Sequence, residues 1–224
     1  FYQMLITWIV YFLFRPKVEW VDRSVKKQLK GKPAVFVFNH THHFDGAFTG
    51  AVLGRYKPYV LVKKNWYEKK AVGTMIGWCR CFPIDLEGAD ASWYSTAEEI
   101  IHRNGSLIIF PEGGIAREGK IEKFKPGAAL VCASTGACVV PMAIYGGYHM
   151  VFGRRQRLLV GKPIESSCPE NMRHSQYAKQ LMKQAEEETK RLYGILEQKY
   201  GKTDTYTESY APQNSTQAEE TAEN

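Results

Sequence analysis

Short continuous apolar runs alternate with longer mixed segments along most of the chain, which is the pattern of an α/β domain. Each run has the length of a strand and ends in polar, proline or glycine residues. The predicted strands span residues 34–38, 58–63, 82–85, 106–110, 138–144 and 158–160. The predicted helices span residues 45–53, 68–78, 92–102 and 127–134, with a long charged helix at 173–200 that we expect to pack on the sheet. Strands joined through helices predict a mostly parallel, buried sheet flanked by helices.

The first 14 residues differ from this pattern, because all but Gln3 and Thr7 are apolar or aromatic. As a helix they would extend about 21 Å, which is short against a bilayer hydrocarbon core of about 30 Å. Seven basic and two acidic residues follow between positions 15 and 32. An apolar helix beside a basic stretch favours docking to an anionic, cytoplasmic membrane surface. A core helix packed under the domain is the alternative.

The chain is therefore expected to have three parts. Residues 1–32 form an apolar membrane-associating helix with a basic linker, and residues 33–201 form the α/β domain. Residues 202–224 are rich in Thr, Ser, Gln and Glu, and we expect an acidic, disordered tail.

Charge and cysteine content narrow the class of partner and the compartment. The net charge is +7, but five acidic residues and no basic ones follow position 202, so the rest of the chain carries 30 basic and 18 acidic residues, or +12. That excess predicts an anionic partner, which could be nucleic acid, a phosphorylated substrate, an acidic carrier or anionic lipid. Five cysteines, an odd number in mostly apolar surroundings, favour buried thiols over a disulfide framework.

The first cluster of reactive side chains is Asn39-His40-x-x-x-x-Asp45, after the strand at 34–38. Functional groups of open α/β sheets gather where strands end and helices begin. Across such a turn Asp45 can accept a hydrogen bond from His40, which fixes the imidazole tautomer and makes the other ring nitrogen a base near neutral pH. No Gly-x-Ser-x-Gly nucleophile motif occurs, so His40 would act directly on a substrate hydroxyl. His42 and His43 lack further ligands at workable spacing, and we predict no metal site.

The second cluster is Phe110-Pro111-Glu112-Gly113-Gly114, which follows the strand at 106–110. Proline and two glycines after a buried strand predict a tight turn that exposes backbone amides and lets a ligand approach closely. In such a turn Glu112 could bind a hydroxyl or brace the turn.

Four motifs in this order resemble the four blocks of the glycerolipid acyltransferases. They are the His40–Asp45 motif, Phe82-Pro83-Ile84-Asp85, Phe110-Pro111-Glu112-Gly113 and Val139-Val140-Pro141-Met142. The resemblance covers about residues 18–164, includes a Phe124-Lys125-x-Gly127-Ala128 segment, and is strongest to the PlsC-type 1-acylglycerol-3-phosphate acyltransferases. It implies transfer of a fatty acyl group from acyl-CoA or acyl-carrier protein to the free hydroxyl of lysophosphatidate, giving phosphatidate, with no cofactor.

The resemblance also implies roles for individual residues. His40 would be the general base and Asp45 its orienting partner, while Glu112 and Gly113 would position the acceptor. Pro141 would shape the wall near the acyl donor.

The chain departs from the family pattern at two places. Leu86 stands where the second block usually has arginine, and the residues after Gly113 keep only the last arginine of the usual third block. Phosphate binding would therefore rest on Arg117 and on Lys63 and Lys64, or on Arg80. Otherwise the acceptor is another lysophospholipid, glycerol-3-phosphate or an amino-lipid hydroxyl.

A non-catalytic lipid-surface protein or a hydrolase on the same scaffold is the alternative class of function. Together with the histidine–aspartate pair, the basic excess indicates anionic membrane lipid and phosphorylated substrates as partners, and no nucleic acid. The expected location is the cytoplasmic face of the cell membrane.

Overall fold

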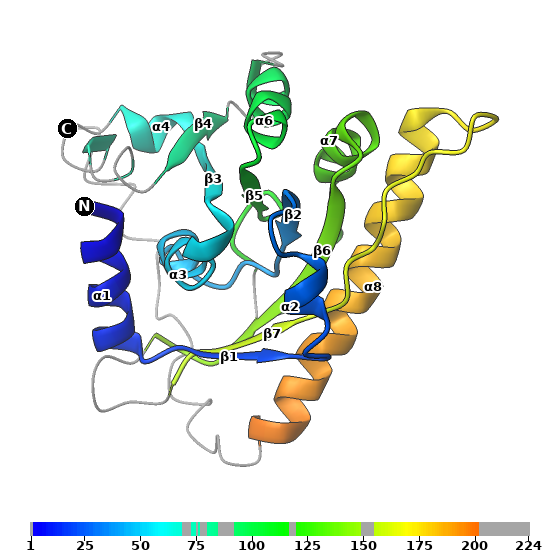
Figure 1. The fold of residues 1–224 in the computed structure, drawn as a ribbon. Coiled ribbons are helices and arrows are strands. Elements are labelled where there is room, and N and C mark those ends of the chain that lie inside the picture. Colours follow the sequence, from blue (N-terminus) through cyan, green and yellow to red (C-terminus); the bar gives the residue numbers. More distant parts are fainter. Residues whose placement is uncertain are drawn as a thin grey trace, which may run out of the picture.

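A single seven-stranded sheet forms the centre of the computed structural model, which describes residues 2–68, 73–74, 76, 80–84, 92–116, 120–148 and 155–201 (Figure 1). The strand order is β1-β7-β6-β2-β5-β3-β4. The strands are β1 (Lys17–Trp20), β2 (Ala34–Val37), β3 (Pro58–Lys63), β4 (Cys81–Ile84), β5 (Ser106–Ile109), β6 (Cys138–Tyr145) and β7 (Arg157–Val160).

Helices cover both faces of this sheet, as the alternating pattern predicts (Figure 1). They are α1 (Tyr2–Phe14), α2 (Val25–Gln28), α3 (Asp45–Val52), the 3-10 turn η1 (Gly54–Tyr56), α4 (Lys64–Tyr67), α6 (Ser92–His102), α7 (Gly127–Thr135) and α8 (His174–Tyr200). The predicted helix at 68–78 and the predicted tail at 202–224 fall largely or wholly outside the described residues.

The sheet is mixed. Five of its six strand pairings are parallel, and β6 with β7 is the antiparallel one. The predicted parallel arrangement therefore holds for β6, β2, β5, β3 and β4, whereas β7 and β1 run the other way. Strand β1 was not predicted, because Lys17–Trp20 is only four residues long and lies inside the basic stretch.

Two apolar layers hold the domain together, one on each face of the sheet. Alternate residues of β2, β5 and β6 pack on α6, α7 and α8 on one side. The residues between them pack on α2 and η1 on the other side. Farther along α8, Leu192 and Leu196 pack on Ala143 and Leu159, so the long helix lies on the sheet as its pattern indicates.

Helix α1 packs on α3 rather than on the sheet. Val10 and Phe14 are buried against Phe48 and Ala51 of α3, and most of the other large side chains of α1 are exposed. Among the residues that the structure describes, no helix combines the length and the apolar character needed to span a membrane.

Candidate active site

The turn between β2 and α3 brings the predicted histidine and aspartate together. His40 follows the end of β2 by three residues, and Asp45 is the first residue of α3. His40 Nδ1 lies 2.9 Å from Asp45 Oδ2, within hydrogen-bond distance. The predicted contact is therefore present. Because Nδ1 faces the carboxylate, Nε2 is the nitrogen left for a substrate, and the His40 side chain is 19% exposed.

Asp45 is fully buried, and several donors surround its carboxylate. Oδ2 also accepts from the backbone amides of Thr41 at 2.6 Å and His42 at 2.9 Å. Oδ1 accepts from the hydroxyl of Tyr148, which lies beyond β6 and has no place in the motifs. The turn thus folds around the carboxylate, which compensates for the loss of water around a buried charge.

Asn39 fixes the start of this turn to the sheet. Its side-chain Nδ2 donates to the Ile144 carbonyl at 3.0 Å, and its Oδ1 accepts from the Ile144 amide at 2.8 Å. The side chain is almost completely buried and takes the place of a backbone pairing between β2 and β6. His40 is therefore anchored one residue away from the rigid centre of the molecule.

The segment after β5 encloses His40 from the other side. The rings of Phe110 and His40 stack with centroids 4.4 Å apart. Glu112 Oε1 accepts from the His40 backbone amide at 2.8 Å, and the His40 carbonyl accepts from the Ala116 amide at 2.8 Å. The two motifs, each predicted to follow a strand end, are thus in direct contact, because β2 and β5 are neighbours in the sheet.

Glu112 has both carboxylate oxygens engaged by backbone. Its Oε2 accepts from the Glu122 amide at 3.0 Å, in addition to the bond from His40 to Oε1. Burial raises the pKa of Glu112, and the two backbone hydrogen bonds partly oppose that rise. Of the two interpretations of this residue, the structure shows the brace. A contact with the acceptor stays a prediction.

Gly113 adopts a left-handed backbone with φ of +79°, as the predicted tight turn requires. A Cβ atom built there would collide with Lys125 Nζ, so the lysine side chain crosses the turn at its glycine. The Lys125 amide also donates to the Pro111 carbonyl at 2.9 Å. The sequence signal for this cation was the Phe124-Lys125-x-Gly127 segment, but Lys125 was not among the predicted site residues.

The other predicted binding residues are less uniformly placed. Exposed Lys63 and Lys64 lie where β3 meets α4, at the same edge of the sheet as His40, and Trp66 of α4 contacts His43 with ring centroids 5.6 Å apart. Pro141 is buried inside β6 opposite Val37. The remaining candidates are Arg80, which precedes β4 and so lies at the opposite edge, and Arg117, which lies outside the described residues.

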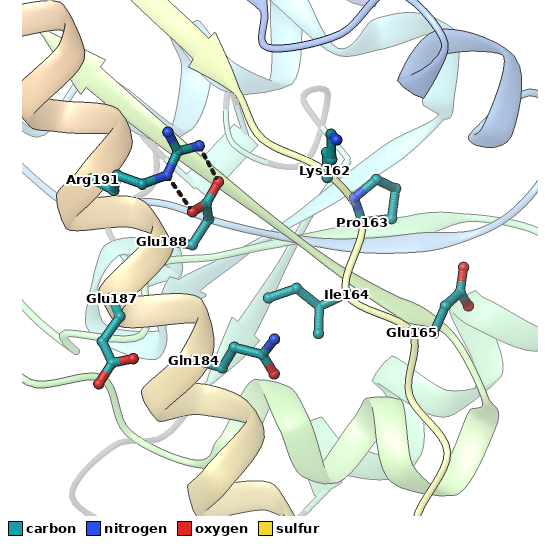
Figure 2. Close-up of a pocket in the computed structure, with 8 residues that line it drawn as sticks. All are labelled: Lys162, Pro163, Ile164, Glu165, Gln184, Glu187, Glu188 and Arg191. Atoms are coloured by element: carbon teal, nitrogen blue, oxygen red, sulfur yellow. Dashed lines mark hydrogen bonds and ion pairs between the residues drawn. The ribbon is translucent and has the colours of Figure 1, made fainter.

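A cavity of about 690 Å³ lies elsewhere, between α8 and the segment after β7 (Figure 2). Its wall includes Ile164, which pairs with Val139 near the start of β6. His40 follows the other end of β2, the strand that pairs with β6, so the cavity and His40 lie at opposite ends of the sheet. Arg191 in its wall is held by Glu188 (Figure 2). None of the predicted site residues that the structure describes lines this cavity. The described residues also contain no group of three His, Cys, Asp or Glu side chains placed to hold a metal ion.

Comparison with known proteins identifies the class to which this fold and site belong. The family model "Acyltransferase" matches residues 18–145, which is more than half of the chain. The match includes both the His40–Asp45 cluster and the cluster at 110–114. The protein therefore belongs to this acyltransferase family.

Three similar proteins carry the same activity in their names. The chain is 30% identical over 149 residues to the chloroplastic 1-acyl-sn-glycerol-3-phosphate acyltransferase LPAT1 of Arabidopsis thaliana, covering 60% of this chain and 40% of that protein. It is 24% identical over 136 residues to a 1-acyl-sn-glycerol-3-phosphate acyltransferase of Bacillus subtilis, covering 59% and 67%. The crystal structure of PlsC, an acyltransferase for 1-acyl-sn-glycerophosphate from Thermotoga maritima, superposes with a TM-score of 0.60 at 21% identity, covering 88% of this chain and 77% of that one.

These matches differ in what they establish. The matched part of the chain spans about two fifths of the length of the plant relative. The likeness to PlsC shows that the α/β fold with a central sheet between helices is shared.

Proposed function

We propose that this protein transfers a fatty acyl group from an acyl thioester to the free hydroxyl of lysophosphatidate, giving phosphatidate. The observation that carries the proposal is the His40–Asp45 contact, in which a fully buried carboxylate holds Nδ1 and leaves Nε2 for the acceptor. Family membership and relatives named for this reaction support it. The thioester is acyl-CoA or acyl-carrier protein, and both are anionic partners for a basic protein.

The chemistry follows from the free imidazole nitrogen. His40 Nε2 takes the proton from the acceptor hydroxyl as its oxygen attacks the thioester carbonyl carbon. Asp45 stabilises the imidazolium that forms, as the aspartate does in a serine-protease triad. The tetrahedral intermediate then collapses, the carbon–sulfur bond breaks, and the thiolate recovers the proton from His40. The products are an ester and a free thiol, and no enzyme nucleophile takes part.

Acceptor recognition is assigned to the edge of the sheet where His40 lies. Lys63 and Lys64 are exposed there and supply positive charge for a phosphate, together with Arg117 from the third motif. Glu112 and Gly113 hold the turn that faces the acceptor, and Pro141 shapes the wall near the acyl donor. Leu86, in place of arginine, is the reason to test other acceptors beside lysophosphatidate.

Helix α1 is proposed to rest on an anionic membrane surface on the cytoplasmic side. Its exposed apolar side chains include Trp8 at 73% and Phe12 at 60% exposure, and their rings stack 6.2 Å apart. Phe44 is 54% exposed and precedes Asp45 in sequence, and its ring centroid lies 6.1 Å from that of Phe14 in α1. The apolar surface thus extends from α1 to the turn that carries the catalytic pair, where a lipid acceptor would arrive. Interfacial helices bind membranes through such a surface.

The catalytic proposal is tested with purified protein, micellar lysophosphatidate, and acyl-CoA or acyl-carrier protein. We expect phosphatidate to form, and His40→Ala to lower turnover by about a hundredfold or more. His102→Ala, an exposed histidine at the end of α6, is the matched control and should leave turnover unchanged. Near-normal turnover of His40→Ala would exclude the base assignment. A panel of other lysophospholipids and glycerol-3-phosphate, with one fixed donor, identifies the acceptor.

The membrane proposal is tested by sedimentation with vesicles containing anionic phospholipid. Trp8→Glu and Phe12→Glu should each reduce the bound fraction severalfold, because a charge replaces an exposed apolar side chain. Gln180→Glu, an exposed change on α8, adds the same charge elsewhere and should bind like wild type. Equal binding by all three variants and wild type would show that α1 does not face the lipid.

A further inference from the structure

Tyr148 lies outside every motif, yet its hydroxyl donates to the carboxylate of Asp45. The two oxygens of this carboxylate differ in their hydrogen-bond partners, because His40 and two backbone amides all contact Oδ2. Tyr148 uses Oδ1, where the next donor is the Thr41 hydroxyl at 3.5 Å. Without the tyrosine hydroxyl, that weak contact would be the one partner that the described residues offer this oxygen, in a carboxylate that is fully buried.

The ring of Tyr148 is fixed from two helices. Phe48 of α3 meets it edge-on with centroids 5.7 Å apart, and Phe14 of α1 does the same at 5.2 Å. The exposed helix α1 therefore contacts the side chain that holds the buried aspartate. The His42 ring also contacts the Tyr148 ring, tilted by 38° with centroids 5.0 Å apart.

We propose that Tyr148 is a positioning residue of the acyltransferase, which orients Asp45 toward His40 and is itself held in place by Phe14 of α1. The inference rests on the proposed role of His40 as the general base. By bonding to Oδ1, the hydroxyl keeps the carboxylate plane turned so that Oδ2 faces the imidazole. It also withdraws negative charge from the carboxylate, which lowers the attraction that Asp45 exerts on the protonated imidazole.

The titration of His40 tests this role. Among the described residues, three titratable groups lie around its ring and backbone. Asp45 of α3 accepts from Nδ1, Glu112 binds the backbone amide, and His42 lies two residues away on the same turn. Only the first of these is changed electrostatically by Tyr148→Phe, since the phenylalanine ring still fills the space between Phe14 and Phe48. Removing the donor leaves more charge on Asp45, so the pKa of His40 should rise.

The experiment compares wild type, Tyr148→Phe and the control Tyr193→Phe, which changes a tyrosine of α8 that packs against Tyr145. For Tyr148→Phe we expect kcat to fall about tenfold with little change in KM, since the substrate is not contacted. The acid limb of the pH–rate profile should move to higher pH by roughly half a unit or more. Wild-type kcat and an unshifted profile for Tyr148→Phe would overturn the proposal, because a packing role alone leaves both unchanged.

Histidine NMR titration separates this inference from the proposed reaction, because it needs no substrate. The His40 resonance is assigned by its loss in His40→Gln, and its pKa should be higher in Tyr148→Phe than in wild type. An unchanged pKa would refute the role of Tyr148 even if phosphatidate is formed. A raised pKa without transfer to any acceptor would refute the proposed function instead.

The contribution of α1 is tested with Phe14→Leu, alone and combined with Tyr148→Phe. If Phe14 acts by holding the tyrosine hydroxyl, Phe14→Leu should raise the pKa of His40 in the wild-type background and have no further effect in Tyr148→Phe. Equal effects of Phe14→Leu in both backgrounds would show that α1 does not act through Tyr148.

Discussion

Glu112→Gln distinguishes a brace from an acceptor ligand, because the two roles predict opposite results. The wild-type carboxylate accepts from two backbone amides, those of His40 and Glu122. A glutamine side chain has the same shape but only one oxygen. Its NH₂ group must then face one of these amides, so two donors oppose each other inside the protein.

The size of the effect follows from these two contacts. A hydrogen bond to a charged group contributes about 1.5–3 kcal/mol, and one of the two is lost. Part of the loss is offset, because glutamine has no charge to desolvate and burial raises the pKa of Glu112. We expect a net loss of about 1–2 kcal/mol in the free energy of unfolding. For a chain of this size that lowers Tm by roughly 2–8 °C.

Thermal unfolding by calorimetry or circular dichroism measures the stability change, and steady-state kinetics measures the consequence for His40. Since one of the two bonds that tie the His40 turn through residue 112 to the loop at 122 is lost, kcat should fall severalfold while KM for the acceptor stays within about twofold. Glu122→Gln is the matched control, because its side chain is exposed and its backbone amide is kept. A Glu112→Gln protein with wild-type Tm and a raised KM alone would refute the brace and assign the carboxylate to the acceptor.

Two further predictions concern the rest of the domain. Burial raises the pKa of Cys138 to about 11 and raises that of Cys132 further, so both thiols should resist alkylation at pH 8 until the protein unfolds. The partly exposed Cys168 should react in the folded protein. Mass spectrometry of the labelled peptides measures both results. Partial burial raises the pKa of Glu19, but the hydrogen bonds from Lys199 and Tyr200 lower it by more, so the pKa lies below its ordinary value. Above pH 4.5 the wild type should therefore be more stable than Glu19→Gln, by less than about 1 kcal/mol. That advantage should disappear as the pH falls through the lowered pKa, and urea titrations at pH 7 and pH 3 measure it; an advantage that grew in acid would contradict the assignment.

Much of the fold could be predicted because its signals are local. Buried parallel strands are continuous apolar runs, and β3 and α6 have the predicted ends. The contact between His40 and Asp45 could be predicted as well, because both residues belong to one strand-to-helix turn and chain geometry leaves few ways to arrange them.

What could not be predicted depends on contacts between distant parts of the chain. Tyr148 is 103 residues from Asp45 and follows an ordinary strand, so no spacing links the two. For Glu112 the sequence left two roles open, and the brace depends on its contacts with the backbone amides of His40 and of Glu122 in a distant loop. The antiparallel pairing of β6 with β7 is likewise set by how the chain returns to the sheet, which the apolar runs do not record.

The direction of the two edge strands decides at which end of the sheet helix α1 lies. Lys17, at the start of β1, pairs with Arg157, which pairs in turn with Tyr145 at the finish of β6. This is the same end of the sheet at which the Asn39 side chain bonds to the Ile144 backbone. Helix α1 immediately precedes β1, so this reversal places α1 beside the turn that carries His40 and Asp45. If β1 and β7 ran parallel to β6, the apolar helix would emerge at the opposite edge, and a protein resting on it would present its catalytic turn to the aqueous phase.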